Sequence, residues 1–228
     1  WQQQAPPFWA LLLAVAGVLW LLLPRGLPLR WLGIVAVLPM FLVQVPRPAY
    51  GAMRVVVLDV GQGLAVVVST QHHTLLYDTG ARYSSHSDSG NRVIVPYLRA
   101  AGIGHLDGLL VSHDDIDHSG GAESILSQIE VRRFLSALPS ENPLTHSQHH
   151  TRCQIGQSWQ WDGVKFDMLF PQVDSYQKSG VKDNDRSCVL RISSRFGRVL
   201  IPGDIERRSE NDLLNSEYAL QSDVLIVP

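Results

Sequence analysis

The sequence predicts a mixed α/β domain that is preceded by a hairpin of two apolar helices, and three observations support this. The first 50 of the 228 residues are almost wholly apolar, apart from Pro, Gly and a few Arg. Beyond residue 50, short β-branched segments are separated by polar loops and amphipathic stretches. The strands come in runs with interspersed helices, which favours mixed sheets with helices outside over a simple βαβ repeat.

Residues 1–50 are interpreted as a membrane segment. Residues 8–23 carry no charge, residues 24–30 form a short basic turn, and residues 31–45 are a second apolar run. Each run is slightly shorter than the roughly 20 residues that cross a bilayer core, but flanking Trp and Arg extend the span. A signal peptide fits less well, because no basic region precedes the first run and a second run follows. A hairpin buried in a soluble protein is the remaining alternative, and the missing initial Met suggests a fragment.

Residues 51–228 are interpreted as one soluble domain. It opens with a β-meander over residues 53–60, 64–69 and 73–77, with turns at residues 61–63 and 71–72. A helix within residues 92–101 ends at Gly102, and Pro96 places its start near that position. Further strands are predicted at residues 106–111, 131–137, 164–170, 188–193, 198–201 and 224–227, and further helices at residues 122–128 and 206–215. Residues 139–152 are expected to be a polar surface loop, including His146, His149 and His150.

The charge and the cysteines limit the classes of function. The net charge is -2 and the isoelectric point is about 6.5, so a broad basic surface that grips nucleic acid by its phosphates is not expected. A small site that holds a phosphodiester through metal ions stays compatible with this charge. Cys153 and Cys188 lie far apart and outside any CxxC motif. They are interpreted as buried thiols, with a disulfide as the alternative, so they indicate no compartment.

The clearest chemical signal is the segment HDDIDH at residues 113–118, in which five of six side chains can bind a metal ion. It follows a buried strand and precedes a helix, where a rigid scaffold can present ligands. Side chains that alternate along a short loop could serve two neighbouring ions, and such pairs polarise an ester or phosphate and lower the pKa of a shared water. The alternative interpretation is a solvated acidic loop.

Residues 113–118 resemble the HxHxDH signature of the metallo-β-lactamase superfamily, with Asp115 where the second His usually stands. The segments DVGQG at residues 59–63, YDTG at 77–80 and LIPGD at 200–204 resemble other landmarks of that fold. With the preceding hairpin, they resemble the C-terminal part of the ComEC family of competence DNA-uptake proteins. The resemblance implies a metallo-β-lactamase-like αββα sandwich, incomplete at its C-terminus and preceded by a transmembrane helical hairpin.

The resemblance also implies a ligand set. His113 and Asp115 would hold one divalent ion, Asp117 and His118 would hold a second, and Asp204 would bridge the two. Asp117 and His118 are accordingly the expected catalytic residues. The expected ions are Mn or Zn, with Mn favoured because a carboxylate in place of an imidazole makes the site richer in oxygen.

Three further residues are expected around the ligands. Asp59 and Asp78, on strand ends that approach the site, would orient ligands or fix turns. Asn184 lies where the superfamily usually has another His, in a segment expected to face the substrate. The superfamily also places a last His just after the strand that here ends at Pro228, so the activity of this fragment is in question.

The first functional hypothesis is metal-dependent phosphodiester hydrolysis in a multi-pass protein of the bacterial inner membrane. The domain would degrade the DNA strand that is not transported, with single-stranded DNA as substrate and with membrane lipid and other DNA-uptake proteins as partners. The second hypothesis is a hydrolase of small esters, lactones or thioesters, since fold alone does not separate these substrates. The third is a non-catalytic transport or scaffold module whose metal site has decayed.

Overall fold

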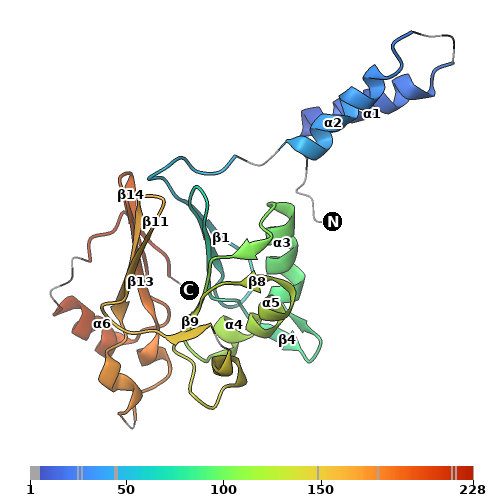
Figure 1. The fold of residues 1–228 in the computed structure, drawn as a ribbon. Helices are drawn as coiled ribbons and strands as arrows, with labels where there is room; N and C mark the ends of the chain where they lie inside the picture. Colours follow the sequence, from blue (N-terminus) through green and yellow to red (C-terminus); the bar gives the residue numbers. More distant parts are fainter. Residues whose placement is uncertain are drawn as a thin grey trace. The chain divides into compact units, whose positions relative to one another are not determined.

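The computed structural model describes residues 6–24, 26, 28–43, 46–147, 149–178, 180–216, 218 and 220–227. The chain divides into two compact units (Figure 1). One comprises the N-terminal hairpin up to Pro46 together with Tyr97–Gly104, and the other comprises Arg47–Pro96 and the chain from His105 onward.

The N-terminal hairpin consists of α1 (Phe8–Leu22) and α2 (Leu32–Leu42). Residues 44 and 45, which the sequence assigns to the second helix, lie outside the described residues. The helices meet at two glycines: a Cβ on Gly17 would lie 2.6 Å from the carbonyl oxygen of Gly33, and the converse distance is 2.5 Å. Such small residues let helix backbones approach closely.

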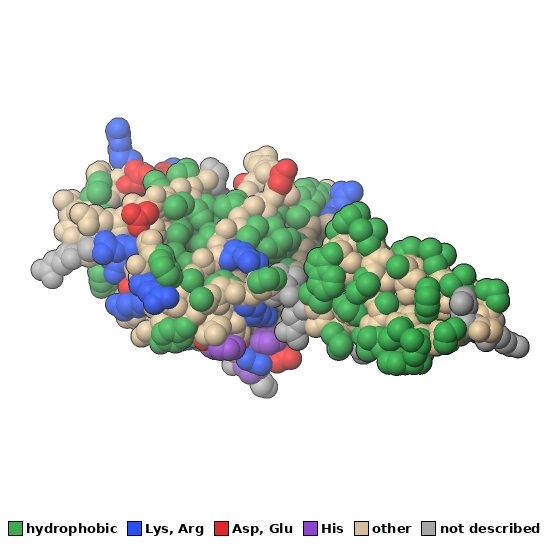
Figure 2. All heavy atoms as spheres, turned by 90° about the horizontal axis from the view of Figure 1, so that it is seen from above, with side chains coloured by type: hydrophobic (Ala, Val, Ile, Leu, Met, Phe, Trp, Pro, Cys, Tyr) green, Lys and Arg blue, Asp and Glu red, His purple; other side chains and the backbone are tan. Residues whose placement is uncertain are grey.

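The hairpin buries little besides its glycines. Only small residues are buried on the two helices, namely Ala10, Ala14, Gly17 and Gly33. Its large apolar side chains are exposed and cover the face visible in Figure 2. Among the described residues, neither of these helices nor any other combines the length and apolar character that a membrane crossing requires.

The domain contains two main sheets. In the first, β1, β2 and β3 are antiparallel and are followed by parallel strands β7, β9 and β10. Its strands are β1 (Arg54–Val57), β2 (Val66–Ser69), β3 (Thr74–Tyr77), β7 (Gly108–Val111), β9 (Phe134–Ser136) and β10 (His150–Arg152). In the second sheet, β11 to β14 are antiparallel and β15 is parallel to β14. Its strands are β11 (Ser158–Trp161), β12 (Val164–Phe170), β13 (Val189–Ser194), β14 (Gly197–Ile201) and β15 (Val224–Leu225).

Two short ladders accompany the main sheets. They join β4 (Arg82–Ser84) to β5 (Ser87–Asp88) and β6 (His105–Leu106) to β8 (Glu130–Val131).

One apolar core lies between the two main sheets. Side chains from the first sheet, including Val66 and Tyr77, form a single buried cluster with side chains from the second, including Phe166 and Leu190. The helices α4 (Ile116–Ser119) and α5 (Ala122–Gln128) lie on the outer side of the first sheet, and α6 (Arg207–Leu214) lies outside the second (Figure 1). Leu213 packs there against Leu200. The domain is therefore an αββα sandwich, as the sequence predicts.

The helix before strand β7 begins beside Pro96, as predicted, but an unpredicted helical turn comes before it. A π-helical turn (Gly90–Ile94) leads directly into α3 (Val95–Ala100). Pro96 does not delay the helical region, because it stands at the start of α3, where proline fits with little cost. The predicted end at Gly102 is correct, and this glycine has the positive φ of 70° that is common just after helices.

The region expected to be a polar loop contains a strand. Within residues 139–152, β10 pairs in parallel with β9, so His150 is placed opposite Phe134. The His150 ring lies 2.8 Å from the hydroxyl oxygen of Ser136 and is partly buried, and this burial lowers the pKa of His150. The interpretation of His150 as a surface-loop histidine is therefore wrong.

The two cysteines form a disulfide, which corrects their interpretation as thiols. The Cα atoms of Cys153 and Cys188 are 5.9 Å apart, and the two residues are separated by 35 positions. Both are fully buried. Cys153 directly follows β10 of the first sheet and Cys188 directly precedes β13 of the second. The bond therefore links the two sheets of the sandwich at one edge.

Candidate metal centre

The candidate site forms where three strands end at one edge of the sandwich. β3 and β7 are parallel neighbours, so Asp78, after β3, lies beside the start of the loop after β7. The Asp78 N–H donates to the Leu110 carbonyl at 2.8 Å. In the second sheet, β14 ends beside the start of β13, with Ile201 opposite Leu190. Asp204 therefore comes from the second sheet and meets residues of the first.

Three predicted ligands converge at this edge. His113, His118 and Asp204 each offer one atom, and these three atoms all lie within 4.8 Å of one another. The Nε2 of His118 is 3.2 Å from the Oδ1 of Asp204. The Nε2 of His113 and the Oδ1 of Asp204 are buried, yet neither has a hydrogen-bond partner. Buried polar atoms rarely stay without a hydrogen bond, so this arrangement is suited to hold a cation.

Asp78 holds the first imidazole directly. Its Oδ2 accepts from the Nδ1 of His118 at 2.8 Å, which leaves the Nε2 of His118 directed toward Asp204. Asp78 is fully buried, and its φ of 57° is unusual for a residue other than glycine. The carboxylate therefore fixes one tautomer of His118, as carboxylates commonly do for histidines that bind metal.

Asp78 reaches the second imidazole through a serine. The hydroxyl of Ser112 donates to Asp78 Oδ2 at 2.8 Å and lies 2.9 Å from the Nδ1 of His113. The N–H of Ser112 also donates to Asp78 Oδ1, at 2.6 Å. With the serine proton directed to Asp78, its oxygen is free to accept from His113 Nδ1. The Nε2 of His113 is then the nitrogen left for a metal.

Ser187 connects the second sheet to this network. Its Oγ lies 3.3 Å from the Nδ1 of His113 and accepts the N–H of Asp204 at 3.2 Å. The next residue, Cys188, donates its N–H to the carbonyl of Ser112 at 3.0 Å, and its own carbonyl accepts from the Tyr77 hydroxyl at 2.7 Å. Sequence reasoning missed Ser112 and Ser187, although both stand next to residues that it had singled out.

The metallo-β-lactamase superfamily model matches residues 58–225, which is most of the chain. The chain belongs to the metallo-β-lactamase superfamily. The αββα sandwich predicted from the HDDIDH segment is thus confirmed as the fold of this superfamily.

Competence proteins are among the relatives. The chain is 36% identical over 226 residues to the competence protein ComA of Neisseria gonorrhoeae, covering 98% of this chain and 30% of that protein. It is 35% identical over 186 residues to the uncharacterized protein YcaI of Escherichia coli, covering 81% and 23%. It is 35% identical over 173 residues to recombination protein 2 of Haemophilus influenzae, covering 73% and 20%. These matches confirm a ComEC-family metallo-β-lactamase-like domain, and the chain spans under a third of each of these relatives.

The donor set fits the divalent ion that this superfamily implies. Two imidazole nitrogens and one carboxylate oxygen suit Zn or Mn, and two of these three atoms are buried without a partner. The carboxylate of Asp115 places a fourth donor atom, the second oxygen, near the centre, with its Oδ2 at 3.5 Å from His113 Nε2. About half of the Asp115 side chain is exposed, at 49%.

Asp117 lies apart from the three converging ligands. The structure fixes its backbone, because its carbonyl accepts the N–H of Leu64 at 3.3 Å. A Cβ on Gly63 would lie 1.9 Å from this carbonyl oxygen, so only glycine fits there. The carboxylate of Asp117 is not within the group formed by the other ligands. Its expected role at a second ion stays a prediction.

Asp59 and Asn184 do not contact the three ligands through any hydrogen bond in the described part of the chain. Asp59 is exposed, and its Oδ1 accepts the N–H of Gly61 at 3.1 Å within its own turn. Asn184 is half-buried at the start of a 3-10 turn, Asn184–Arg186. Its role toward a substrate stays a prediction.

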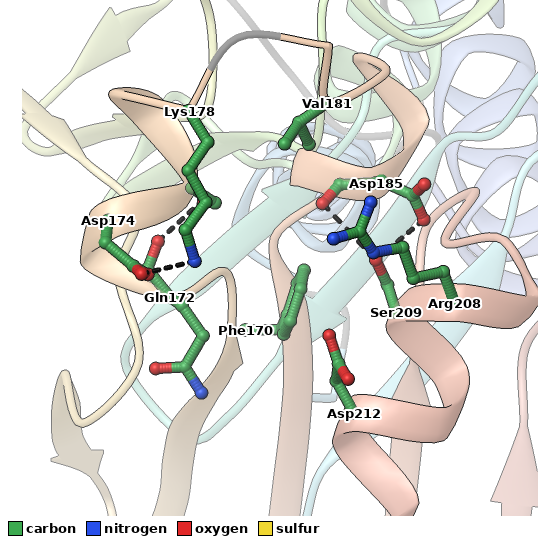
Figure 3. Close-up of a pocket in the computed structure, with 10 residues that line it drawn as sticks. Phe170, Gln172, Asp174, Lys178, Val181, Asp185, Arg208, Ser209 and Asp212 are labelled. Carbon is green, nitrogen blue, oxygen red and sulfur yellow. Dashed lines mark hydrogen bonds and ion pairs between the residues drawn. The ribbon is translucent and has the colours of Figure 1, made fainter.

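The residue after Asn184 has a structural role. Asp185 is buried, and its Oδ1 accepts from the Ser209 hydroxyl at 2.6 Å and from the Glu206 N–H at 3.2 Å. Figure 3 shows this contact at one side of a small pocket of about 50 Å³, with the Asp174–Lys178 ion pair at the other side. Asp185 thus anchors the start of α6 to the segment that carries Ser187.

The electrostatics of the site favour a cation. Burial opposes the protonated form of His118, but Asp204 and Asp78 outweigh burial and raise the pKa of His118 to about 10. His118 in turn lowers the pKa of Asp204. Without metal, His118 is therefore a cation held between two carboxylates. A divalent ion would replace the proton on Nε2 and leave the proton that Nδ1 donates to Asp78.

Proposed function

We propose that this domain is a metal-dependent phosphodiesterase that cleaves single-stranded DNA during DNA uptake. The observation that carries the proposal is the convergence of His113 Nε2, His118 Nε2 and Asp204 Oδ1, with His113 Nε2 buried and without a hydrogen bond. An arrangement of imidazole and carboxylate donors at a strand edge is suited to hydrolysis without a Ser or Cys nucleophile.

The residues of this chain would divide the work between them. His113, His118 and Asp204, with Asp115 beside them, would hold the ions, for which we propose two Mn or Zn. When bound, such ions supply Lewis-acid stabilisation of a phosphoryl group. Asp78 would keep both imidazoles in the metal-binding tautomer, directly and through Ser112.

The DNA substrate is inferred from the relatives and from the hairpin. One relative is named a competence protein and another a recombination protein. The α1–α2 hairpin exposes apolar side chains over most of its surface, which suits a part of a larger bundle in a membrane. We infer a multi-pass protein of the bacterial inner membrane that acts with other uptake proteins and degrades the strand that is not transported.

A hydrolase of small esters, lactones or thioesters is the second candidate. A groove of about 600 Å³ includes Asp204 and is otherwise lined mainly by apolar side chains, among them Leu200, Leu213 and Leu225. Apolar walls with a few polar groups are typical of sites for small molecules. This groove would accept the apolar part of an ester more readily than it would accept a polyanion.

The deciding experiment compares cleavage of two substrates by the full chain in detergent, with Mn or Zn added. The proposal expects degradation of single-stranded DNA that is lost in His118→Ala and Asp204→Asn and kept in Asp59→Asn, the exposed control. Ester cleavage without DNA cleavage would select the second candidate. Failure to bind either metal, measured by calorimetry, would instead indicate a decayed site.

A further inference from the structure

A second polar pocket lies beside the metal-binding loop. It has a volume of about 190 Å³, smaller than the ~300–1,000 Å³ of sites for drug-sized ligands. Its wall includes two arginines, Arg152 and Arg186, together with Tyr176. The pocket can therefore hold one charged group of a larger molecule and not a whole small substrate.

The two loops that form this pocket both contact the loop that carries the ligands. On one side, the Asn142 side chain donates to Asp114 Oδ1 at 2.9 Å, and Asp114 directly follows His113. On the other side, the segment from Asp183 leads to Ser187, which contacts His113. The pocket thus adjoins the metal centre.

The strand register indicates how far Arg152 lies from the end of the strand that leads to His113. Val111 lies opposite Ser136, and Ser136 lies opposite Arg152 on the next strand. Neighbouring strands are about 4.8 Å apart, so Arg152 is on the order of 10 Å across the sheet from the strand end that leads to His113. An anionic group at Arg152 would be near the bond that is cut, but not at it.

Arg152 is the arginine of this pocket that forms no ion pair with a described residue. None of the ion pairs in the described part of the chain includes Arg152. Its Nη2 donates to the Ser140 hydroxyl at 2.9 Å and to the Leu138 carbonyl at 3.4 Å. Its guanidinium carbon lies 4.5 Å from the centre of the Tyr176 ring. These contacts hold one face of the guanidinium in place and leave other N–H groups for a ligand.

The second arginine of the pocket is already paired, whereas Glu141 joins no ion pair with a described residue. Arg186 pairs with Asp183 at 3.1 Å and donates to the carbonyls of Lys178 and Ser175. Glu141, at the rim, is exposed and joins none of the ion pairs among the described residues. The Tyr176 hydroxyl donates to the Cys153 carbonyl at 2.8 Å, so the ring that supports Arg152 is anchored beside the disulfide.

We propose that this pocket is a subsite in which Arg152 binds a phosphate of the substrate strand next to the scissile phosphodiester. The proposal rests on the phosphodiesterase function proposed above. Arginine suits this role because its planar fork donates two parallel hydrogen bonds to phosphate. The subsite would keep the strand in register over the ions and would add a local attraction for DNA in a chain whose net charge is -2.

The test measures binding of a fluorescent single-stranded oligonucleotide to the full chain in detergent, with a chelator present to remove metal contributions. Arg152→Gln should weaken binding about tenfold, the loss expected for a charge-assisted contact. The slope of log affinity against log salt should fall by about 0.7, as for one lost phosphate contact on a single strand. Arg152→Lys, which keeps the charge, should keep the salt slope.

Arg195→Gln is the matched control. Arg195 is an exposed arginine in the turn that follows β13, whereas Ser187 and the ligand-bearing loop lie at the opposite end of this strand. It should change neither the affinity nor the slope. An oligonucleotide of abasic sites should show the same loss with Arg152→Gln, since the contact is to phosphate. Equal effects of the two arginine substitutions, or a loss that requires bases, would overturn the subsite.

Cleavage assays separate this proposal from the proposed function. With metal present, Arg152→Gln should raise KM for DNA while kcat changes little, because a uniform binding contact is lost. If no variant cleaves DNA but binding still depends on Arg152, the phosphodiesterase function fails and the anionic subsite stands. If cleavage occurs and both KM and binding are unchanged by Arg152→Gln, the subsite fails and the function stands.

Discussion

Asp78 is the residue on which both metal-binding imidazoles depend. It contacts His118 directly and reaches His113 through Ser112. Asp78→Asn keeps the size of the side chain and tolerates the positive φ, but it removes the charge. We expect metal affinity to fall by about 10–100-fold, as for other partners of metal ligands. Isothermal titration would measure this loss.

The matched control for this substitution is Asp59→Asn. Like Asp78, Asp59 lies just after a strand of the first sheet. Its side chain is exposed, however, and accepts a hydrogen bond from Gly61 within its own turn. Its substitution should leave metal affinity unchanged. If Asp78→Asn bound metal as tightly as the unsubstituted chain, Asp78 would have no part in orienting the ligands.

His118 makes the stability of the metal-free protein depend on pH. Its pKa is raised from 6.5 to about 10, mainly because Asp204 and Asp78 outweigh the effect of burial. A raised pKa stabilises the fold fully below the unfolded value, and this contribution is lost as the pH rises through the folded value. We therefore expect the Tm of the metal-free protein to fall between about pH 7 and 10.

His118→Gln should remove most of this decrease, which thermal unfolding at a series of pH values would show. Metal affinity should change in the opposite direction and increase with pH, because the ion competes with the proton on Nε2. A metal-free Tm that is flat over this range in the unsubstituted chain would contradict the charged state assigned to His118.

The ligands of the candidate site could be predicted from the sequence, but the residues that orient those ligands could not. Residues 113–118 and Asp204 were identifiable because imidazoles and carboxylates follow apolar strands. Ser112 and Ser187 carry no such signal, since serine is common in loops and only the folded geometry directs each hydroxyl to a ligand. The disulfide was equally hidden, because the spacing of Cys153 and Cys188 says nothing about their distance in space.

At the scale of elements, sequence pattern succeeded where a segment has its own periodicity. Helix α5 and strand β12 have the predicted bounds, residues 122–128 and 164–170. Strands β10 and β11 were missed, because they are short, carry polar residues and form only through pairing with β9 and β12. Such pairing depends on tertiary context, which strand propensity does not encode.

The disulfide supports the segment that joins the two halves of the metal site. Cys188 follows Ser187, which contacts His113 and the backbone of Asp204. Cys153→Ala combined with Cys188→Ala should lower the free energy of unfolding by about 2–4 kcal/mol, because the closed loop constrains the unfolded chain. Urea unfolding with and without reductant would measure this effect.

The same double substitution should also weaken metal binding, since the position of Ser187 would be less well fixed. Reductant should destabilise the unsubstituted chain and leave the double variant unchanged, which separates loss of the bond from loss of packing. Unchanged stability after complete reduction would show that the bond does not support this edge of the sandwich.

At the scale of the whole molecule, the disulfide bears on where the domain works. Structural disulfides persist in oxidising compartments such as the bacterial periplasm and are rare in the cytosol. Cys153 and Cys188 are both fully buried in the core, so the bond is part of the folded interior. Combined with the membrane placement and the DNA substrate proposed above, this predicts that the domain lies on the periplasmic side of the inner membrane, where incoming DNA would meet it before transport.

Alkylation in intact bacteria tests this placement. If cells that carry the native protein are quenched in acid, denatured and treated with a maleimide reagent, both cysteines should escape modification unless a reductant is added first. The same domain expressed alone in a reducing cytosol should be alkylated at both cysteines and should unfold at a lower temperature. Because burial alone also slows alkylation, denaturation before labelling is essential: only a covalent bond protects a cysteine in the unfolded chain. Modification of both cysteines without reductant would place the domain in a reducing compartment and would contradict degradation of DNA outside the cytosol.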